Sequence, residues 1–413
     1  MRGVRTWGRT GGVAVLAAAL TCASLIPALH SVNTTDRGDA AGAGGASSAT
    51  GVVQVVAGSD SQRADYAQRQ VAAMPTRAKA ASIVMAHIST TDPVALRDYM
   101  ARTGVGGFIL MGANVPATEA ELRAITAALT VDPALPPLIG IDQEGGDVSR
   151  LPWDHFASSV THKSEPAANA ERAFAGRGAL VQRAGIGVNF GVVADVTEQP
   201  GSFIWRRSMG WPPEDAAARV GAAVTGEGDQ ALSTLKHFPG HGAASGDSHV
   251  LIPTADTTFE QWRARDALPF AAGIDAGASL VMFGHLAFPN VDAAPASLSA
   301  EWHRVLRDDL GFTGVAVTDD LGMLQATGIP EYRDPVANAV AALAAGNDLL
   351  LGVMFSDANT ADALIDGITT AVEAGAVPMS RLDDAATRVF ALRTEVAGAG
   401  RGMVPCTECT PAG

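Results

Sequence analysis

The sequence is poor in aromatic residues and in positive charge for its length. Phe, Trp and Tyr make up 5% of its 413 residues, and 29 Lys and Arg stand against 43 Asp and Glu, so the formal net charge is −14. No basic cluster follows the first ten residues. Because binding to a phosphate backbone needs a dense positive patch and base stacking needs aromatic rings, we expect no nucleic-acid partner.

Three motifs that would assign a common function are also missing. No GxGxxG follows the first predicted strand and no GxxxxGK[ST] occurs, which removes the main support for a dinucleotide or nucleotide fold. No GxSxG elbow is present, so a serine nucleophile is poorly supported.

Cysteine is scarce as well, with three residues in the chain. Cys22 lies in the N-terminal segment, and Cys406 and Cys409 form a CxxC near the C-terminus. A lone CxxC without a second pair or a neighbouring histidine is weak evidence for zinc. A local disulfide is the favoured interpretation in an exported protein.

The N-terminal segment has the pattern of an export signal. An uncharged apolar run spans residues 11–29, and three arginines precede it: Arg2, Arg5 and Arg9. We interpret residues 1–33 as a cleaved signal peptide, with an uncleaved membrane anchor as the main alternative. A lipid anchor on Cys22 is less favoured because no small residue directly precedes it. The expected location is therefore extracellular or in the cell envelope, with membrane attachment through this segment as the alternative.

Composition divides the rest of the chain into a linker, one domain and a tail. Residues 34–65 are mostly small and polar, which predicts a flexible linker, and residues 398–413 form a similar tail. Residues 66–397 remain as a single catalytic domain large enough for a well-buried core. We expect this domain to be a monomer.

Short apolar runs alternate with helical stretches throughout the domain. The predicted strands are 107–111, 137–141, 187–190, 232–235, 279–283, 314–317 and 348–351, with an eighth in 81–87. The predicted helices are 119–129, 169–184, 213–225, 259–276, 301–310 and 336–345, with Pro269 expected to kink or divide the fourth. Thr118 with Glu121, and Ser380 with Asp383, predict capped helix starts. Continuously apolar strands between helices indicate a parallel sheet covered on both faces.

Nearly every predicted strand ends in a polar residue. These residues are Asp142, Asp195, Lys236 and His237, His285, and Asp319 and Asp320. A (β/α) barrel builds its site from the C-terminal ends of many strands, whereas an open sheet binds mainly at one switch point. The pattern therefore predicts an α/β fold of TIM-like barrel type.

The stretch LKHFPGHGAASGDSHVLIP, residues 235–253, concentrates the titratable groups. His237 ends a strand, and His241, Asp247 and His249 follow on a Gly-rich loop. All four are metal-ligand types, but Pro239 next to a glycine breaks any helix that could present ligands at i and i+4, so a metal site is disfavoured.

Glycosyl transfer fits these residues better. Retaining hydrolysis needs a carboxylate nucleophile and a separate acid/base. Asp319, at the end of a buried strand, is positioned for the first role. Asp247 and His249, two apart in an extended loop, would point the same way, and the carboxylate would raise the basicity of the imidazole.

Four motifs together resemble glycoside hydrolase family 3. They are IDQEGGDVSRL (141–151), RRSMG (206–210), KHFPGHG with DSH (236–249), and GVAVTDDLGM (314–323). They are most similar to the β-N-acetylhexosaminidases that remove N-acetylglucosamine from peptidoglycan fragments, and the resemblance covers residues 75–395. It implies a TIM-like barrel, retaining hydrolysis through a glycosyl-enzyme intermediate, a carbohydrate substrate and no metal or organic cofactor.

The resemblance assigns roles residue by residue. Asp319 matches the nucleophile, His249 the acid/base, and Asp247 its partner. The residues that match sugar-binding positions are Asp142, Arg150, Arg207, Lys236 and His237. Charged donors and acceptors of this kind give directional hydrogen bonds to vicinal hydroxyls.

The chain also departs from the family pattern. Asp147 stands where the family commonly has arginine, so one basic group is missing near the expected site. Trp205 is inserted before Arg207, in a segment that lacks the usual asparagine and glycine spacing, and RSM replaces the more usual RSF. These departures predict altered outer subsites or a changed leaving-group preference.

Other polar residues have structural interpretations. His241 is expected to stabilise its loop by hydrogen bonding. His285 could contact ligand or cap its strand, Asp320 is expected to be structural beside a cation, and Asp195 to orient Arg207. Lys236, at the end of a buried strand, requires a carboxylate or a ligand.

Two alternative functions stay open at this stage. A phosphorylase is the first, because a neutral histidine acid/base repels incoming phosphate less than a glutamate would. A non-catalytic muropeptide-binding barrel is the second, on the basis of the departures around Asp147 and Trp205.

Overall fold

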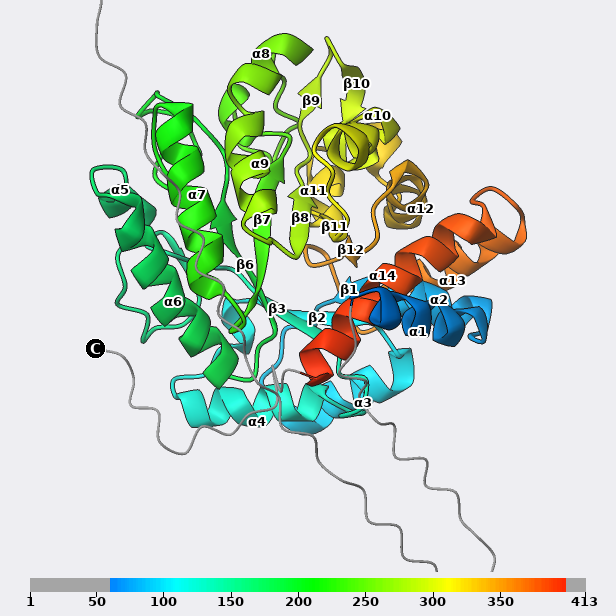
Figure 1. Ribbon diagram of the computed structural model, residues 1–413. Coiled ribbons are helices and arrows are strands. Elements are labelled where there is room, and N and C mark those ends of the chain that lie inside the picture. Colours follow the sequence, from blue (N-terminus) through cyan, green and yellow to red (C-terminus); the bar gives the residue numbers. More distant parts are fainter. Residues whose placement is uncertain (1–59, 399–413) are drawn as a thin grey trace, which may run out of the picture. The chain divides into compact units, whose positions relative to one another are not determined.

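The computed structural model describes residues 60–398, which form a parallel β-barrel surrounded by helices (Figure 1). Its strands are β1 (Val84–Ala86), β2 (Gly107–Leu110), β3 (Leu138–Ile141), β6 (Val188–Val193), β7 (Leu232–Phe238), β8 (Leu280–Phe283), β11 (Val315–Thr318) and β12 (Leu350–Leu351). They neighbour one another in chain order, and β12 pairs with β1. A bridge between Val317 and Leu349 joins the two ends of the sheet and closes the barrel. The predicted TIM-like fold is confirmed.

The predicted strands are confirmed, including the eighth, β1, which lies inside 81–87. All residues of β1, β2, β3, β8 and β11 are buried, because the barrel interior covers one face and the helices cover the other. β7 ends at Phe238, one residue beyond the predicted strand end at His237, and carries Lys236 and His237 to the C-terminal end of the barrel.

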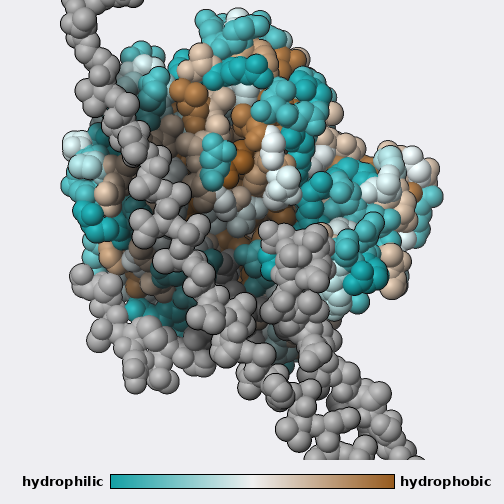
Figure 2. All heavy atoms as spheres, viewed as in Figure 1, coloured by the Kyte–Doolittle hydropathy of each residue, from teal (hydrophilic) through white to brown (hydrophobic). Residues whose placement is uncertain are grey.

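The main helices are α1 (Asp60–Ala72), α2 (Thr76–Ser82), α3 (Pro93–Thr103), α4 (Glu119–Leu129), α6 (Ala167–Arg183), α7 (Pro213–Glu227), α8 (Phe259–Ala264), α9 (Ala267–Asp275), α10 (Ala300–Arg304), α11 (Leu321–Ala326), α12 (Pro335–Ala345), α13 (Thr360–Glu373) and α14 (Met379–Gly398). Hydrophilic residues cover most of the outer helices in Figure 2, and hydrophobic residues show chiefly in the recesses between them. No helix within 60–398 is both long enough and apolar enough to span a bilayer.

Helix boundaries follow the predictions with two corrections. The 259–276 segment is divided, but between α8 and α9 rather than at Pro269, which lies in the first turn of α9. First-turn amides have no intrahelical partner, so proline is tolerated there. Thr118 and Glu121 form the predicted capping box, whereas α14 begins before Ser380, which is therefore not its N-cap.

The scarce aromatic residues are concentrated behind the end of β7. Phe238 is fully buried, and its ring centroid lies 5.0–5.9 Å from four other rings: Trp262, Phe270, Phe283 and Trp302. Edge-to-face packing of this kind adds to the burial of apolar area. The residue directly after His237 is thereby anchored in the core, which fixes the strand end that carries Lys236.

A buried ionic cluster occupies the opposite, N-terminal end of the barrel. Asp348, just before β12, has no exposed surface and accepts hydrogen bonds from three arginines: Arg307 at 2.6 Å, Arg381 at 2.6 Å and Arg388 at 3.3 Å. The Ala316 amide of β11 donates a further bond at 3.0 Å. This single carboxylate therefore ties β11 to the loop before β12 and to α14.

The signal peptide or anchor (1–33), most of the linker (34–65), nearly all of the tail (398–413) and the CxxC pair lie outside the described residues. Within the described part, α1 begins at Asp60 and packs against α14, with Tyr66 and Phe390 ring centroids 6.1 Å apart.

Candidate active site

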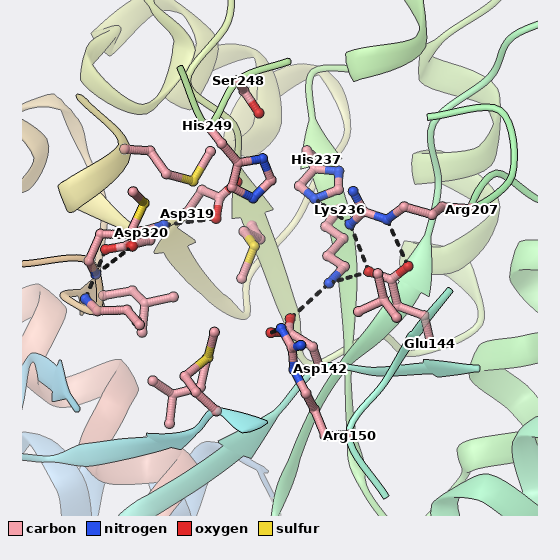
Figure 3. Close-up of a pocket in the computed structure, with 18 residues that line it drawn as sticks. Asp142, Glu144, Arg150, Arg207, Lys236, His237, Ser248, His249, Asp319 and Asp320 are labelled. Carbon is pink, nitrogen blue, oxygen red and sulfur yellow. Dashed lines mark hydrogen bonds and ion pairs between the residues drawn. The ribbon is translucent and has the colours of Figure 1, made fainter. Parts of the chain in front are cut away.

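A cavity of about 170 Å³ opens at the C-terminal ends of the barrel strands (Figure 3). Every sequence-predicted site residue except Asp247 lines it. The polar wall on one side is formed by Asp142, Glu144, Arg150, Arg207, Lys236 and His237, and Asp319 and His249 lie across from it. The lining also includes four methionines: Met111, Met282, Met323 and Met354. The volume is below the roughly 300–1,000 Å³ typical of sites for drug-sized ligands, so the cavity suits one ring-sized group.

Lys236 is the centre of the polar wall. Its Nζ lies 3.0 Å from an Asp142 carboxylate oxygen and 2.7 Å from one of Glu144. Arg150 donates to the other Asp142 oxygen at 3.3 Å, and Arg207 forms a bidentate pair with Glu144 at 2.8 and 2.9 Å. The prediction that buried Lys236 needs a carboxylate is confirmed with two of them.

The cations of this cluster keep its buried carboxylates ionised. Burial alone would raise the pKa of Asp142, but the charges of Lys236 and Arg150 outweigh it and lower the pKa to about 2. Burial likewise opposes ionisation of Glu144, yet Lys236 and Arg207 lower its pKa. Both carboxylates are therefore ionised at neutral pH and present acceptor oxygens to the cavity.

Glu144 also belongs to this wall, although the sequence analysis did not predict it as a site residue. It lies on β4 (Gln143–Gly145), which pairs with β5 (Val148–Ser149) in a hairpin after β3. Gly145 and Gly146 have φ of +82° and +75°, and a Cβ on Gly145 would lie 2.0 Å from the Arg177 guanidinium. The EGG sequence thus makes the tight turn that directs Glu144 inward. Because buried Lys236 requires a carboxylate partner, this requirement was the sequence signal that could have indicated Glu144.

His237 lies beside this cluster as a neutral imidazole. Its Nδ1 is 2.8 Å from Asp195, and its Nε2 is 3.3 Å from Arg207 Nη2. Burial and the charge of Arg207 hold its pKa well below the ordinary value, so Nδ1–H donates to Asp195 while Nε2 accepts from Arg207. Asp195 therefore orients His237 and the turn after it, and not Arg207 directly as expected.

Asp319 follows β11 and lines the cavity below His249 in the view of Figure 3. Burial opposes ionisation, but the Asp320 amide, which donates a hydrogen bond at 2.8 Å, and the charge of nearby Lys236 lower the pKa of Asp319. It is an ionised carboxylate open to the cavity. Asp320 is structural, as predicted, but its partners are the amides of Gly322, Val353 and Met354 rather than a cation.

Asp247 and His249 form the predicted dyad. Asp247 Oδ1 lies 2.6 Å from His249 Nδ1 and accepts the His249 amide at 2.9 Å. The loop turns here, since the Val250 amide bonds to the Asp247 carbonyl. An Asx turn, and not the extended chain we expected, therefore brings the two side chains together. His249 lines the cavity with its side chain about half exposed.

Two further histidines have structural partners. The His241 amide donates to Asp195 at 2.5 Å and its Nε2 lies 3.1 Å from Ser248 Oγ, which confirms its loop-stabilising role. His285 Nδ1 lies 2.7 Å from Ser297 Oγ, and its Nε2 2.8 Å from the Asp320 carbonyl. His285 is fully buried and is not among the cavity-lining residues, so it caps its strand.

The departures from the family pattern have partners of their own. Asp147 does not line the cavity; it forms a bidentate ion pair with Arg206 at 2.6 and 2.9 Å. The Lys163 ammonium lies 4.7 Å from the centre of the Trp205 ring and donates to the Ser208 carbonyl. Burial and the charges of two arginines lower the pKa of Lys163 to about 8.

No group of three or more His, Cys, Asp or Glu side chains within 60–398 is arranged to hold a metal ion. An ionised carboxylate with open access can attack an electrophilic carbon, and an imidazole backed by a carboxylate can transfer a proton.

Comparisons with known proteins agree with this geometry. The model for the glycosyl hydrolase family 3 N-terminal domain matches residues 75–392. A β-hexosaminidase of Pseudomonas aeruginosa is 35% identical over 277 residues, which cover 64% of this chain and 80% of the relative.

Two solved structures share the fold. A family 3 β-N-acetylglucosaminidase from Paenibacillus sp. aligns with a TM-score of 0.72 at 31% identity, covering 82% of this chain and 66% of that one. The β-N-acetylhexosaminidase from Beutenbergia cavernae aligns with a TM-score of 0.67 at 27% identity, covering 78% and 98%.

Proposed function

Because this chain belongs to glycoside hydrolase family 3, we propose that it is a retaining exo-β-N-acetylglucosaminidase. The observation that carries the proposal is a cavity of the size of one sugar ring. It is lined by the ionised Asp319, by His249 of the Asp247–His249 dyad and by the charged wall around Lys236. The named activities of its relatives point the same way.

The reaction has two steps. Asp319 attacks the anomeric carbon, the bond to the leaving oxygen breaks, and doubly protonated His249 donates its Nε2 proton to that oxygen. Neutral His249 then takes a proton from water, which attacks the anomeric carbon and releases Asp319 with net retention. Asp247 holds Nδ1–H throughout and stabilises the imidazolium.

The polar wall binds the hydroxyl groups of the terminal sugar. Asp142 and Glu144 supply acceptors, and the cationic side chains of Lys236 and Arg150 supply donors. The methionine side chains that line the cavity can pack against the acetamido methyl group of the sugar.

The cavity size supports removal of one terminal residue at a time. We propose peptidoglycan-derived glycans as the natural substrate. The support is the resemblance to enzymes of that type and the export signal predicted at residues 1–33, which would place the domain in the cell envelope.

Turnover of a nitrophenyl β-N-acetylglucosaminide, with the first-formed anomer followed by NMR, tests the proposal. We expect β-N-acetylglucosamine as the initial product and much slower turnover of the matching glucoside and xyloside. Absence of turnover would contradict the proposal and favour a non-catalytic binding barrel.

Added phosphate distinguishes the phosphorylase alternative. Hydrolysis predicts free sugar at a rate independent of phosphate. Formation of sugar 1-phosphate in proportion to phosphate would instead identify a phosphorylase.

A further inference from the structure

We propose that Phe203 is the platform for the leaving group, on which the second sugar ring of the substrate packs. The inference rests on the proposed function and concerns the side of the site beyond the scissile bond. It assigns the substrate class as β-linked disaccharides and longer glycans.

Phe203 does not line the cavity but lies next to two residues that do. Its ring centroid is 5.8 Å from that of His249, in an edge-to-face arrangement, and 5.9 Å from the Arg207 guanidinium carbon. Both neighbours line the cavity. A group that leaves past His249 therefore emerges beside this ring.

The ring is open to receive such a group. Phe203 is 38% exposed, and the two residues after His249, Val250 and Leu251, are 61% and 41% exposed. Large apolar side chains on two loops beside an acid/base are typical of a binding surface rather than of solvated loops. An aromatic face packs against the apolar C–H face of a pyranose, which makes a sugar the fitting occupant.

The loop that carries Phe203 is fixed on its C-terminal side. Two consecutive arginines make bidentate ion pairs to the β4–β5 hairpin: Arg206 to Asp147, and Arg207 to Glu144. His241 packs on the platform from the core side, with ring centroids 5.4 Å apart. The platform is therefore preorganised before substrate arrives, which lowers the entropy lost on binding.

The same arrangement includes two of the chain's departures from the family pattern. The family arginine at position 147 would repel Arg206, whereas Asp147 attracts it. The inserted Trp205 is held by Lys163, 4.7 Å from its ring. Asp147 and Trp205 therefore each make a contact that helps to anchor this loop.

The test compares kcat/KM for a β-1,4-linked N-acetylglucosamine disaccharide and for methyl β-N-acetylglucosaminide. In Phe203→Ala we expect about a tenfold loss on the disaccharide and little change on the methyl glycoside, since binding energy from the remote ring serves the transition state. Phe203→Leu should recover part of the loss, and Trp211→Ala, at another exposed aromatic residue of the same loop, should behave as wild type.

Equal losses on both substrates, with a shifted pH profile, would overturn the inference, because Phe203 would then act only by supporting His249. Absence of wild-type turnover on both substrates would remove the proposed function itself. Asp147→Arg should lower the disaccharide preference about threefold through loss of the Arg206 anchor; an unchanged preference in both Phe203→Ala and Asp147→Arg would also overturn it.

Discussion

The barrel holds buried carboxylates at both ends, and they are used differently. At the N-terminal end, Asp348 accepts four hydrogen bonds, from three arginines and a backbone amide. At the C-terminal end, Asp142 and Glu144 share Lys236 and each take one arginine. The first cluster joins elements of the barrel wall, whereas the second borders a cavity.

The two clusters differ in whether hydrogen-bonding groups beside them remain available to a ligand. Asp348 is fully enclosed, and all of its hydrogen bonds are made to groups of the folded chain, so it has no surface open to a ligand. In the cavity, Asp319 accepts one hydrogen bond, from the Asp320 amide, so acceptor capacity remains for a ligand. Burial of charge by itself therefore does not mark a ligand site; the cavity beside the second cluster and the free acceptor capacity of Asp319 distinguish it from the first.

Asp319→Asn should give the largest effect and the clearest separation of the two ends. We expect kcat to fall on the order of 10⁴-fold or more because the nucleophile is lost. The melting temperature should stay within a few degrees, since no ion pair is broken. Asp308→Asn, at a carboxylate with 67% exposure, serves as control. Substantial residual turnover would place the nucleophile elsewhere.

Asp348→Asn should have the opposite effect to Asp319→Asn: a large loss of stability without a change in substrate binding. Removing the charge of this fully buried carboxylate leaves three partly buried arginines without their shared counter-charge, so the free energy of unfolding should fall by about 3–5 kcal/mol. Denaturant titration measures it, and KM of the remaining folded enzyme should be unchanged. Asp384→Asn, which loses a half-exposed partner of Arg381 and Arg388, should cost under about 1 kcal/mol. Similar losses in both variants would mean that burial of Asp348 is unimportant.

Glu144→Gln tests whether the cavity cluster serves the ligand. The amide keeps the shape but weakens the hold on Arg207 and Lys236, so kcat/KM should fall about 100-fold, or ~2–3 kcal/mol. Glu301→Gln removes an equivalent bidentate pair, to Arg304 on an exposed helix, and should leave activity unchanged. Loss of stability without loss of activity would assign Glu144 to structure.

Glu227 provides a third, smaller case, because it is buried without a cation bonded to it. Its carboxylate accepts from Ser233 at 2.6 Å and from Asn189 at 2.5 Å, and burial raises its pKa to about 7. The folded state thus holds a proton that the unfolded state releases near pH 4.5, so stability is full below that pH and falls as the pH rises through 7.

In Glu227→Gln the free energy of unfolding should therefore decline less steeply between pH 5 and 7, by about 1 kcal/mol per pH unit. Denaturant titrations at several pH values measure this slope. Glu373→Gln, at an exposed position, should keep the wild-type slope. A variant at Glu227 with that same slope would show that the carboxyl group does not hold its proton in the folded state.

Much of the scaffold was predictable from local pattern. Continuously apolar runs predicted the barrel strands, including β1, and Thr118 with Glu121 predicted the start of α4. These features depend on neighbours in sequence, and so the sequence contains them. The break between α8 and α9 did not follow Pro269, because a first-turn proline removes no helical hydrogen bond.

The site was predictable where single motifs carry it and not where distant segments meet. Asp319, Asp142 and His249 come from strand ends and one loop. Glu144 required the fold of the β4–β5 hairpin, since its partner Lys236 is some ninety residues away. Asp348 likewise meets its three arginines across 33–41 residues of chain, and no local pattern indicates such a cluster.

The paired anchors Arg206 and Arg207 have a consequence for how this enzyme can diversify. They join the segment that we propose faces the leaving group to the β4–β5 hairpin, which we propose faces the bound sugar. Residues 199–205 can therefore be exchanged as a cassette between related enzymes, provided that the arginines and their acidic partners travel with it. Such grafts should change the choice of leaving group while the chemical step proceeds as before.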